Sequence, residues 1–312
     1  MTFNWAVAHK MATMAANHAH QDTGVARDEY VDVFAALQAG GIFCIAKPLQ
    51  GLAGVYAAPA SGGPAVMLSS ALGEVAMRHT AGHELGHHVF GHGTVMDDRV
   101  DPDAGTLGAP LPDEEKLAEA FAAWFLMPLP AVRSAMRRSG IGQPGGPEDV
   151  HQIACWLGTS FAGTARHLVN LRLADTRQAE EWNRAWRNSS GRIRAALCGS
   201  RTPPPGRVWV LGPGAHRARL HVLPEDSLVY PGGELPDALP PGLAVRTEQQ
   251  LSLEPQAVVA VTRAMNPSCQ LTVPVSGADL ITVTLVPPPL RSGIDSAWRA
   301  REEPPSPHPE EA

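Results

Sequence analysis

Residues His83 to His87 read His-Glu-Leu-Gly-His, and this stretch constrains the fold more than any other part of the chain. In an α-helix, residues four positions apart lie one turn apart on the same face. Two imidazoles at that spacing can bind one metal ion, and the Glu84 carboxylate can reach a water molecule beside it. The stretch therefore predicts a helix that carries part of a metal site.

The same residues match the pattern His-Glu-x-x-His, in which two histidines bind zinc and the glutamate is the general base of a hydrolase. The pattern is only moderately specific by itself. The surrounding sequence must therefore supply a further ligand and a fitting fold.

The composition is that of an ordinary globular protein. A chain of 312 residues is long enough for two or three domains, and 44% of the residues are hydrophobic against 18% charged. The formal net charge of −6 argues against binding of the whole molecule to nucleic acid or to an anionic membrane. The oligomeric state is left open.

Several absences predict where the protein works. No run approaches the ~20 apolar residues of a membrane span, and the N-terminus has no signal-peptide pattern. The four cysteines lie far apart, with no Cys-x-x-Cys pair, at positions 44, 155, 198 and 269. We therefore expect a reduced, cytoplasmic protein without membrane association.

The spacing of apolar residues predicts alternating helices and short strands around the motif. The helices expected in the first part of the chain are residues 4–20, 28–39, 72–91 and 114–126. The strands expected there are residues 42–46, 55–57 and 65–68, and a Pro- and Gly-rich loop covers residues 94–112.

The second part of the chain changes character twice. Residues 129–173 look helical with a break at 140–147, and one further helix is expected at 176–198. The clearest linker is Thr202–Gly206, with three consecutive prolines. Short β-type runs follow it at residues 208–211, 219–222, 257–262, 270–274 and 280–285.

A catalytic zinc ion normally has three protein ligands and one open position. His92 follows His83 by nine residues, one short of the spacing at which some zinc peptidases place a third histidine, and Phe90 stands where a glycine is needed. Cys44 lacks the neighbours that would mark it as a ligand. A carboxylate on a later helix remains.

Glu115 best fits that carboxylate, because it begins the apolar face of the helix at 114–126. Glu119 lies one turn later on the same side, where it can accept a hydrogen bond from a ligand histidine. Glu114 points about 100° away and is expected in solvent. The alternative for this acidic cluster is that it merely complements the helix dipole.

Two stretches together resemble the ImmA/IrrE family of metallopeptidases. One is Arg78–His87, Arg-His-Thr-Ala-Gly-His-Glu-Leu-Gly-His, and the other is Glu115–Pro128, with Ala118, Phe121 and the ending Leu-Met-Pro. The resemblance covers about residues 5–175. It differs at His79, where the family usually has Phe, and at Glu119, where Asn or Asp is usual.

The resemblance implies that His83, His87 and Glu115 bind Zn²⁺ and that Glu84 is the catalytic base. It also implies an endopeptidase that cleaves a helix-turn-helix transcriptional repressor and so relieves repression, in a stress response or in the control of mobile elements. The alternative is a non-catalytic DNA- or protein-binding regulator with a structural metal site.

We therefore expect an α+β protein in four parts. A mainly helical, zincin-like metallopeptidase domain with a small three-stranded sheet covers residues 1–130. A helical, helix-turn-helix-like segment follows at 131–200, then a small all-β module at 201–288. A disordered tail rich in Pro and Glu is expected at 289–312.

Three features have weaker support. A donor for the oxyanion of the reaction is expected among Tyr56, His79, His88 and His92, and the sequence does not rank them. The strand at 55–57 is a candidate edge for an extended substrate. Residues 149–171 fit a helix-turn-helix template, but only Arg166, His167 and Arg172 are basic or potentially so, which favours packing over DNA binding.

Overall fold

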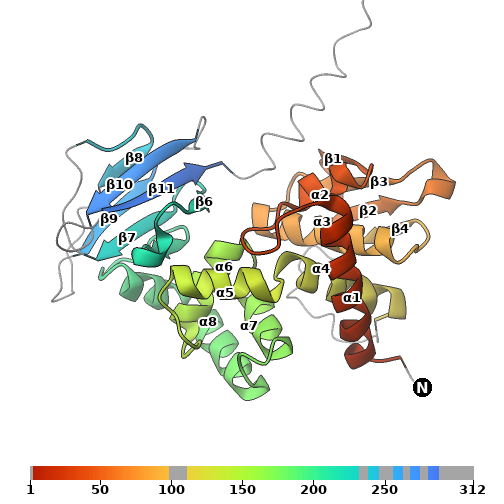
Figure 1. Ribbon diagram of the computed structural model, residues 1–312, viewed down its shortest axis with the longest axis horizontal. Helices are drawn as coiled ribbons and strands as arrows, with labels where there is room; N and C mark the ends of the chain where they lie inside the picture. Colours follow the sequence, from red (N-terminus) through yellow and green to blue (C-terminus); the bar gives the residue numbers. More distant parts are fainter. Residues whose placement is uncertain are drawn as a thin grey trace, which may run out of the picture.

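The computed structural model describes residues 3–97, 111–231, 238–245, 256–262, 268–274 and 280–287, and over these ranges the fold is α+β, as predicted. Figure 1 shows a helical part with a sheet at one end, further helices in the middle and β-strands at the other end. The tail expected at 289–312 lies outside the described residues. None of the described helices is both long enough and apolar enough to cross a membrane.

The first part contains four helices and a mixed sheet. Its helices are α1 (Trp5–Thr23), α2 (Val33–Ala39), α3 (Glu74–Val89) and α4 (Asp113–Leu126). Its strands are β1 (Phe43–Lys47), β2 (Gly54–Ala57), β3 (Ala65–Ser69) and β4 (Val95–Asp97), with a 3-10 turn, η1 (Pro59–Ser61), between β2 and β3. The side chains of Asn4 and Asp32 accept hydrogen bonds from the first turns of α1 and α2 and so define where both helices begin.

The sheet has four strands, in the order β1-β3-β2-β4, and not the three expected. Strand β1 runs parallel to β3, whereas β2 is antiparallel to both β3 and β4. Strand β4 falls in a segment expected as a loop, because only Val95 and Met96 are apolar there. The prediction that residues 55–57 form a free edge is wrong, because Val55 pairs with Met67 on one side and with Met96 on the other.

Helix α4 is packed between α1 and α3, and small residues allow the close approach on both sides. The buried face of α1 consists of alanines: Ala8, Ala12, Ala16 and Ala19. On α3, a Cβ added to Gly86 would lie 3.0 Å from Ala118 Cα, and one added to Gly82 would lie 3.4 Å from Ala122 Cβ. The spacing between α3 and α4 therefore depends on residues with little or no side chain.

The middle part is helical, as expected, with a break between its first two helices. It consists of α5 (Leu129–Arg138), α6 (Pro147–Leu157), α7 (Phe161–Asn170) and α8 (Thr176–Leu197). Gly158 ends α6 in the left-handed conformation (φ 61°), and Ser160 caps α7. Two helices joined by this short turn occupy the segment that fits the helix-turn-helix template.

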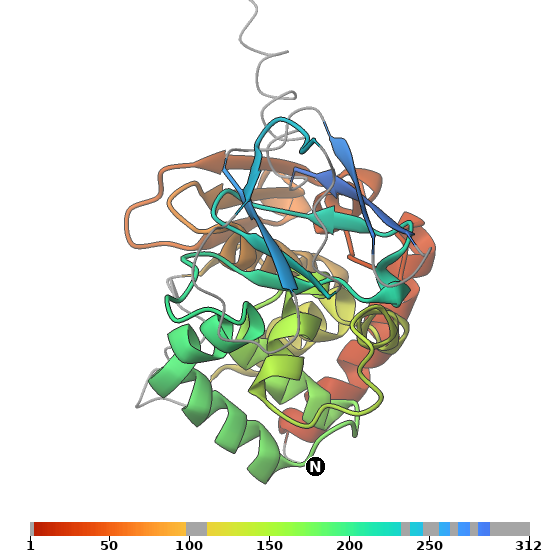
Figure 2. The same cartoon turned by 90° about the vertical axis from the view of Figure 1, so that its left-hand side faces the viewer.

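The C-terminal part contains two sheets. One has the order β5-β7-β9-β8 and the other β10-β11-β6. The strands are β5 (Val208–Val210), β6 (Arg219–His221), β7 (Ser227–Pro231), β8 (Leu243–Val245), β9 (Gln256–Val261), β10 (Cys269–Pro274) and β11 (Leu280–Val286); the 3-10 turn η2 (Pro213–Ala215) follows β5. We call these strands the β module; Figure 2 shows them in front of the helices.

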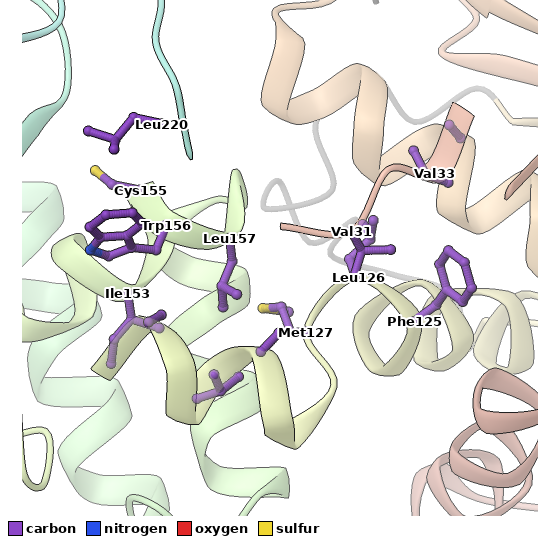
Figure 3. Close-up of a cluster of buried hydrophobic side chains, with 14 of the residues drawn as sticks. Val31, Val33, Phe125, Leu126, Met127, Ile153, Cys155, Trp156, Leu157 and Leu220 are labelled. Atoms are coloured by element: carbon purple, nitrogen blue, oxygen red, sulfur yellow. The ribbon is translucent and has the colours of Figure 1, made fainter. Parts of the chain in front are cut away.

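One hydrophobic core connects all three parts. Buried side chains form a continuous cluster from Phe125 and Leu126 of α4, through Trp156 and Leu157 of α6, to Leu220 of β6 (Figure 3). Even the proline-rich segment expected as a linker is packed, since Pro204 is buried and its carbonyl accepts a hydrogen bond from Arg194 Nε.

Helix α6 is joined to the β module by hydrogen bonds as well. The Gln152 side chain donates to the carbonyl of Val208 and accepts from the amide of Val210, and His151 Nε2 accepts from the amide of Val208. A helix thus satisfies backbone groups at the side of β5. We call this contact the α6–β5 seam.

Candidate metal centre

The structure brings together the three side chains that the sequence nominated as zinc ligands. His83 and His87 are buried on α3, and their Nε2 atoms lie 3.0 Å apart. The Glu115 carboxylate, from the first turn of α4, lies 3.3 Å from His83 Nε2 and 3.5 Å from His87 Nε2. One ligand atom from each residue lies within 4.8 Å of the other two, and this is the only such group in the described part of the chain.

This donor set suits a divalent metal. Two imidazole nitrogens and one carboxylate oxygen are ligands that zinc takes at catalytic sites, where a fourth position stays open. Glu114 is exposed, as expected, and Asp113 binds Lys116 at 2.8 Å. Of the three acidic residues in the first turn of α4, Glu115 alone faces the two histidines. Stabilising the helix dipole requires only a negative charge in the first turn of α4, and it does not require a carboxylate that faces the two histidines.

Glu84 is fully buried between α3 and β2. A Cβ added to Gly54 would lie 2.5 Å from Glu84 Oε1 and 2.6 Å from Thr80 Cγ2. Strand β2 can therefore pass this close to α3 only with glycine at position 54. The sequence did not predict this close approach, because Gly54 looks like an ordinary turn residue before a short strand.

Glu119 lies between two histidines. Its Oε2 atom is 3.1 Å from His79 Nε2 and 3.6 Å from His83 Nδ1. Burial by itself would raise the pKa of Glu119, but the adjacent His79 and His83 hold that pKa well below its usual range. A carboxylate at this position can fix the ring orientation of a metal-binding histidine.

The carboxylates also change the proton affinity of His83. Burial alone would lower the pKa of His83, but hydrogen bonding to Glu115 and Glu119 raises it to about 10. Without metal, this imidazole therefore holds a proton at neutral pH. A metal ion has to displace that proton when it binds.

His92 contacts His87 on the side of the ring that faces away from His83 and Glu115. Its Nδ1 atom lies 2.8 Å from His87 Nδ1, and its backbone amide donates to the His87 carbonyl. Gly91, in the left-handed conformation (φ 67°), turns the chain back after α3 and makes this contact possible. His92 lies outside the metal-binding group, as the spacing indicated, and its pairing with His87 was not foreseen.

The remaining candidates are also placed. The Tyr56 hydroxyl lies 3.0 Å from His88 Nδ1, so two of the four oxyanion candidates contact each other. Cys44 lies on β1, where burial raises the pKa of its thiol to about 12. That shift disfavours the thiolate that a metal ligand requires.

The helix-turn-helix candidate loses one of its three basic groups. His167 is buried, its Nε2 atom lies 3.0 Å from the Met127 carbonyl, and burial lowers its pKa to about 3. It therefore stays neutral inside the fold. Arg166 and Arg172 are exposed.

Comparison with known proteins identifies the part of the chain that carries the site. The family model of peptidase family M78, described as the IrrE N-terminal-like domain, matches residues 41–142. This range is narrower than the span of about 5–175 expected from the sequence, but it contains His83, Glu84, His87 and Glu115. No curated protein matches the chain. Residues 41–142 thus match the IrrE N-terminal-like domain of the M78 peptidases, the family that the two sequence stretches resemble.

Proposed function

We propose that the protein is a zinc-dependent endopeptidase. The observation that carries this proposal is the meeting of His83, His87 and Glu115 at one point, in a domain of a peptidase family. The group contains three residues, in the range that the structure describes, and so leaves a coordination position for water. Structural zinc sites normally fill all four positions with protein ligands.

The chain's own residues divide the chemistry between them. A zinc ion bound by His83, His87 and Glu115 would supply Lewis-acid activation of water and of the scissile carbonyl. Glu84 takes up the proton of the attacking water and passes it to the leaving nitrogen. Glu119 orients the ring of His83 through its Nδ1 atom, and His92 orients the ring of His87 in the same way.

We further propose that the substrate is a helix-turn-helix transcriptional repressor in the cytoplasm, and that cleavage relieves repression. The support for this step is the resemblance of Arg78–His87 and Glu115–Pro128 to the ImmA/IrrE metallopeptidases. A narrow specificity of this kind fits a regulated enzyme acting in a stress response or in the control of mobile elements.

The test begins with elemental analysis of the purified full-length protein for zinc. The protein is then incubated with the helix-turn-helix repressor encoded nearest to its gene, and the products are measured by mass spectrometry. Glu84→Gln should abolish cleavage while zinc stays bound, and the exposed Glu114→Gln is the matched control. Equal cleavage by Glu84→Gln and the wild type would show that the mechanism is wrong.

A further inference from the structure

Arg78 connects the first turns of α3 to the rest of the molecule. It lies five residues before His83 and is 1% exposed. Its Nη1 atom donates to the carbonyls of Leu157 and Gly158 at the end of α6, and its Nη2 atom donates to the Val31 carbonyl at 2.6 Å. One guanidinium thus ties the helix that carries His83 and His87 to two other segments.

Tyr30 continues this connection into the β module. The Arg78 guanidinium carbon lies 3.8 Å from the centroid of the Tyr30 ring, and the His221 ring of β6 stacks on the same ring at 3.7 Å. Two groups this close to one centroid must lie on opposite faces of the ring. Arg78, Tyr30 and His221 therefore form a three-layer stack, which we call the Arg–Tyr–His stack.

Both ends of the stack are anchored. The Tyr30 hydroxyl donates to Glu74 Oε1 at 3.3 Å, so Tyr30 contacts α3 at two positions one turn apart. In the β module, Arg207 Nη2 donates to the His221 carbonyl and to Asp226, both at 2.7 Å. Neither end can move without disturbing a buried polar contact.

Gly158 shows how tightly the stack is enclosed. A Cβ added there would lie 2.5 Å from Arg78 Nη1 and 2.5 Å from Tyr30 Cε2, and Gly158 also has a positive φ of 61°. The end of α6 therefore closes over the stack from the side.

The position of α3 matters for the third ligand. His83 and His87 belong to one helix and keep their spacing, but Glu115 comes from α4. Its distance from both imidazoles depends on how α3 lies on α4. Gly82 and Gly86 determine how closely α3 approaches α4. Glu74 and Arg78, at the beginning of α3, both contact Tyr30, whose ring stacks on His221 of the β module.

We propose that Arg78, Tyr30 and His221 are positioning residues through which the β module holds α3 at the distance where Glu115 completes the metal site. This inference depends on the proposed function only in that the site binds zinc. It gives the β module a definite task, although the family model ends at residue 142.

The test uses the full-length protein and two measurements besides activity: the zinc dissociation constant, by competition with a chromophoric chelator, and hydrogen exchange of the α3 amides. Tyr30→Leu, which removes both stacking faces, should weaken zinc binding about ten-fold, and His221→Leu, which removes one, about three-fold. Exchange at the beginning of α3 should become faster in both variants.

Matched variants separate positioning from packing. His221→Phe keeps a ring on Tyr30 and should restore zinc binding to within about two-fold of the wild type. Tyr30→Phe keeps both stacking faces but loses the hydrogen bond to Glu74, so its zinc affinity should lie between those of the wild type and Tyr30→Leu. Thr272→Ala changes an exposed residue of β10 that pairs with Thr282, four residues before the β11 partner of His221, and should change neither measurement.

The outcomes distinguish this inference from the proposed function. If the leucine variants melt earlier but keep the zinc affinity and α3 exchange of the wild type, the stack only packs the two parts together and the inference is wrong. If zinc affinity responds as expected but no repressor is cleaved, the positioning role stands and the proposed function fails. If the wild type binds no zinc, the proposed function fails and the inference fails with it.

Discussion

The α3–α4 contact and the α6–β5 seam hold their elements together by opposite means. Gly82 and Gly86 let α3 approach α4 because they have no side chains, whereas His151 and Gln152 reach from α6 to the backbone of β5. At the two glycines the first contact is determined by shape, although the carboxylates of Glu115 and Glu119 also reach across it to histidines of α3; the second is determined by buried hydrogen bonds to backbone groups. The first should therefore be sensitive to added volume, and the second to protonation and to loss of polar groups.

Acid should have the largest effect, and it should act on the seam. Burial lowers the pKa of His151 to about 3, so the unfolded chain takes up a proton near pH 6.5 while the folded chain stays neutral. The stability due to His151 is complete above about pH 6.5 and is lost as the pH falls towards 3, on the order of 5 kcal/mol. Urea unfolding at a series of pH values measures it.

His221 and His167 lie outside the seam, and burial lowers the pKa of each to about 3, so they add to the same acid loss; a variant of His151 isolates the share of that residue. His151→Gln can still accept from the Val208 amide but has no proton to gain. Its free energy of unfolding should depend less steeply on pH than that of the wild type. An unchanged slope would mean that the seam is not the acid-sensitive region.

Added volume should act on the other contact. Gly86→Val places side-chain atoms against Ala118, where a Cβ alone would lie 3.0 Å from the backbone. We expect the free energy of unfolding to fall by about 3 kcal/mol and zinc binding to weaken, because α3 and α4 are pushed apart. Gly93→Val is the control, since a Cβ there meets nothing within 4 Å.

Loss of a polar group should act on the seam with a smaller effect. Gln152→Leu keeps most of the volume but removes the hydrogen bonds to the Val208 carbonyl and the Val210 amide. We expect the free energy of unfolding to fall by about 2 kcal/mol. Urea unfolding measures this loss through the tryptophan fluorescence, to which the buried Trp209 of β5 contributes. If Gln152→Leu were as stable as the wild type, hydrogen bonds would not be what holds the seam.

Counted per pH unit, the smallest effect is on zinc binding, about 1.4 kcal/mol of binding free energy, and it concerns the proton on His83. Because the two carboxylates raise the pKa of His83 to about 10, a proton is lost on zinc binding, and affinity should rise about ten-fold per pH unit between pH 7 and 9. Calorimetric titrations in buffers of different ionisation enthalpy measure that proton. Glu119→Gln should make the zinc affinity depend less steeply on pH. A zinc affinity of the wild type that does not change with pH would contradict the prediction.

The residues of the candidate metal centre were predictable because their chemistry is local in sequence. His83, Glu84 and His87 lie within one helical turn, and Glu115 begins the apolar face of the next long helix. The partners of these residues were not predictable in the same way. His92 reaches His87 only through the left-handed turn at Gly91, and the closeness of Gly54 to Glu84 depends on how β2 crosses α3.

The strands show a similar division. The runs that became β5, β6, β9, β10 and β11 were predicted. Strands β7 and β8 were missed, because Pro231 ends the first and prolines 240 and 241 precede the second. Pairing was beyond the sequence as well, since β6 lies beside β11, more than fifty residues later. Contacts of that range depend on the whole fold.

The continuous core has a consequence for how the molecule can be divided. Trp156 of α6 meets Trp209 of β5 with ring centroids 5.3 Å apart, and both are almost completely buried. A fragment that ends after the matched residues 41–142 would expose the underside of that core to water and would tend to aggregate. We therefore expect heating to melt the intact chain in one cooperative step, as a single thermodynamic unit.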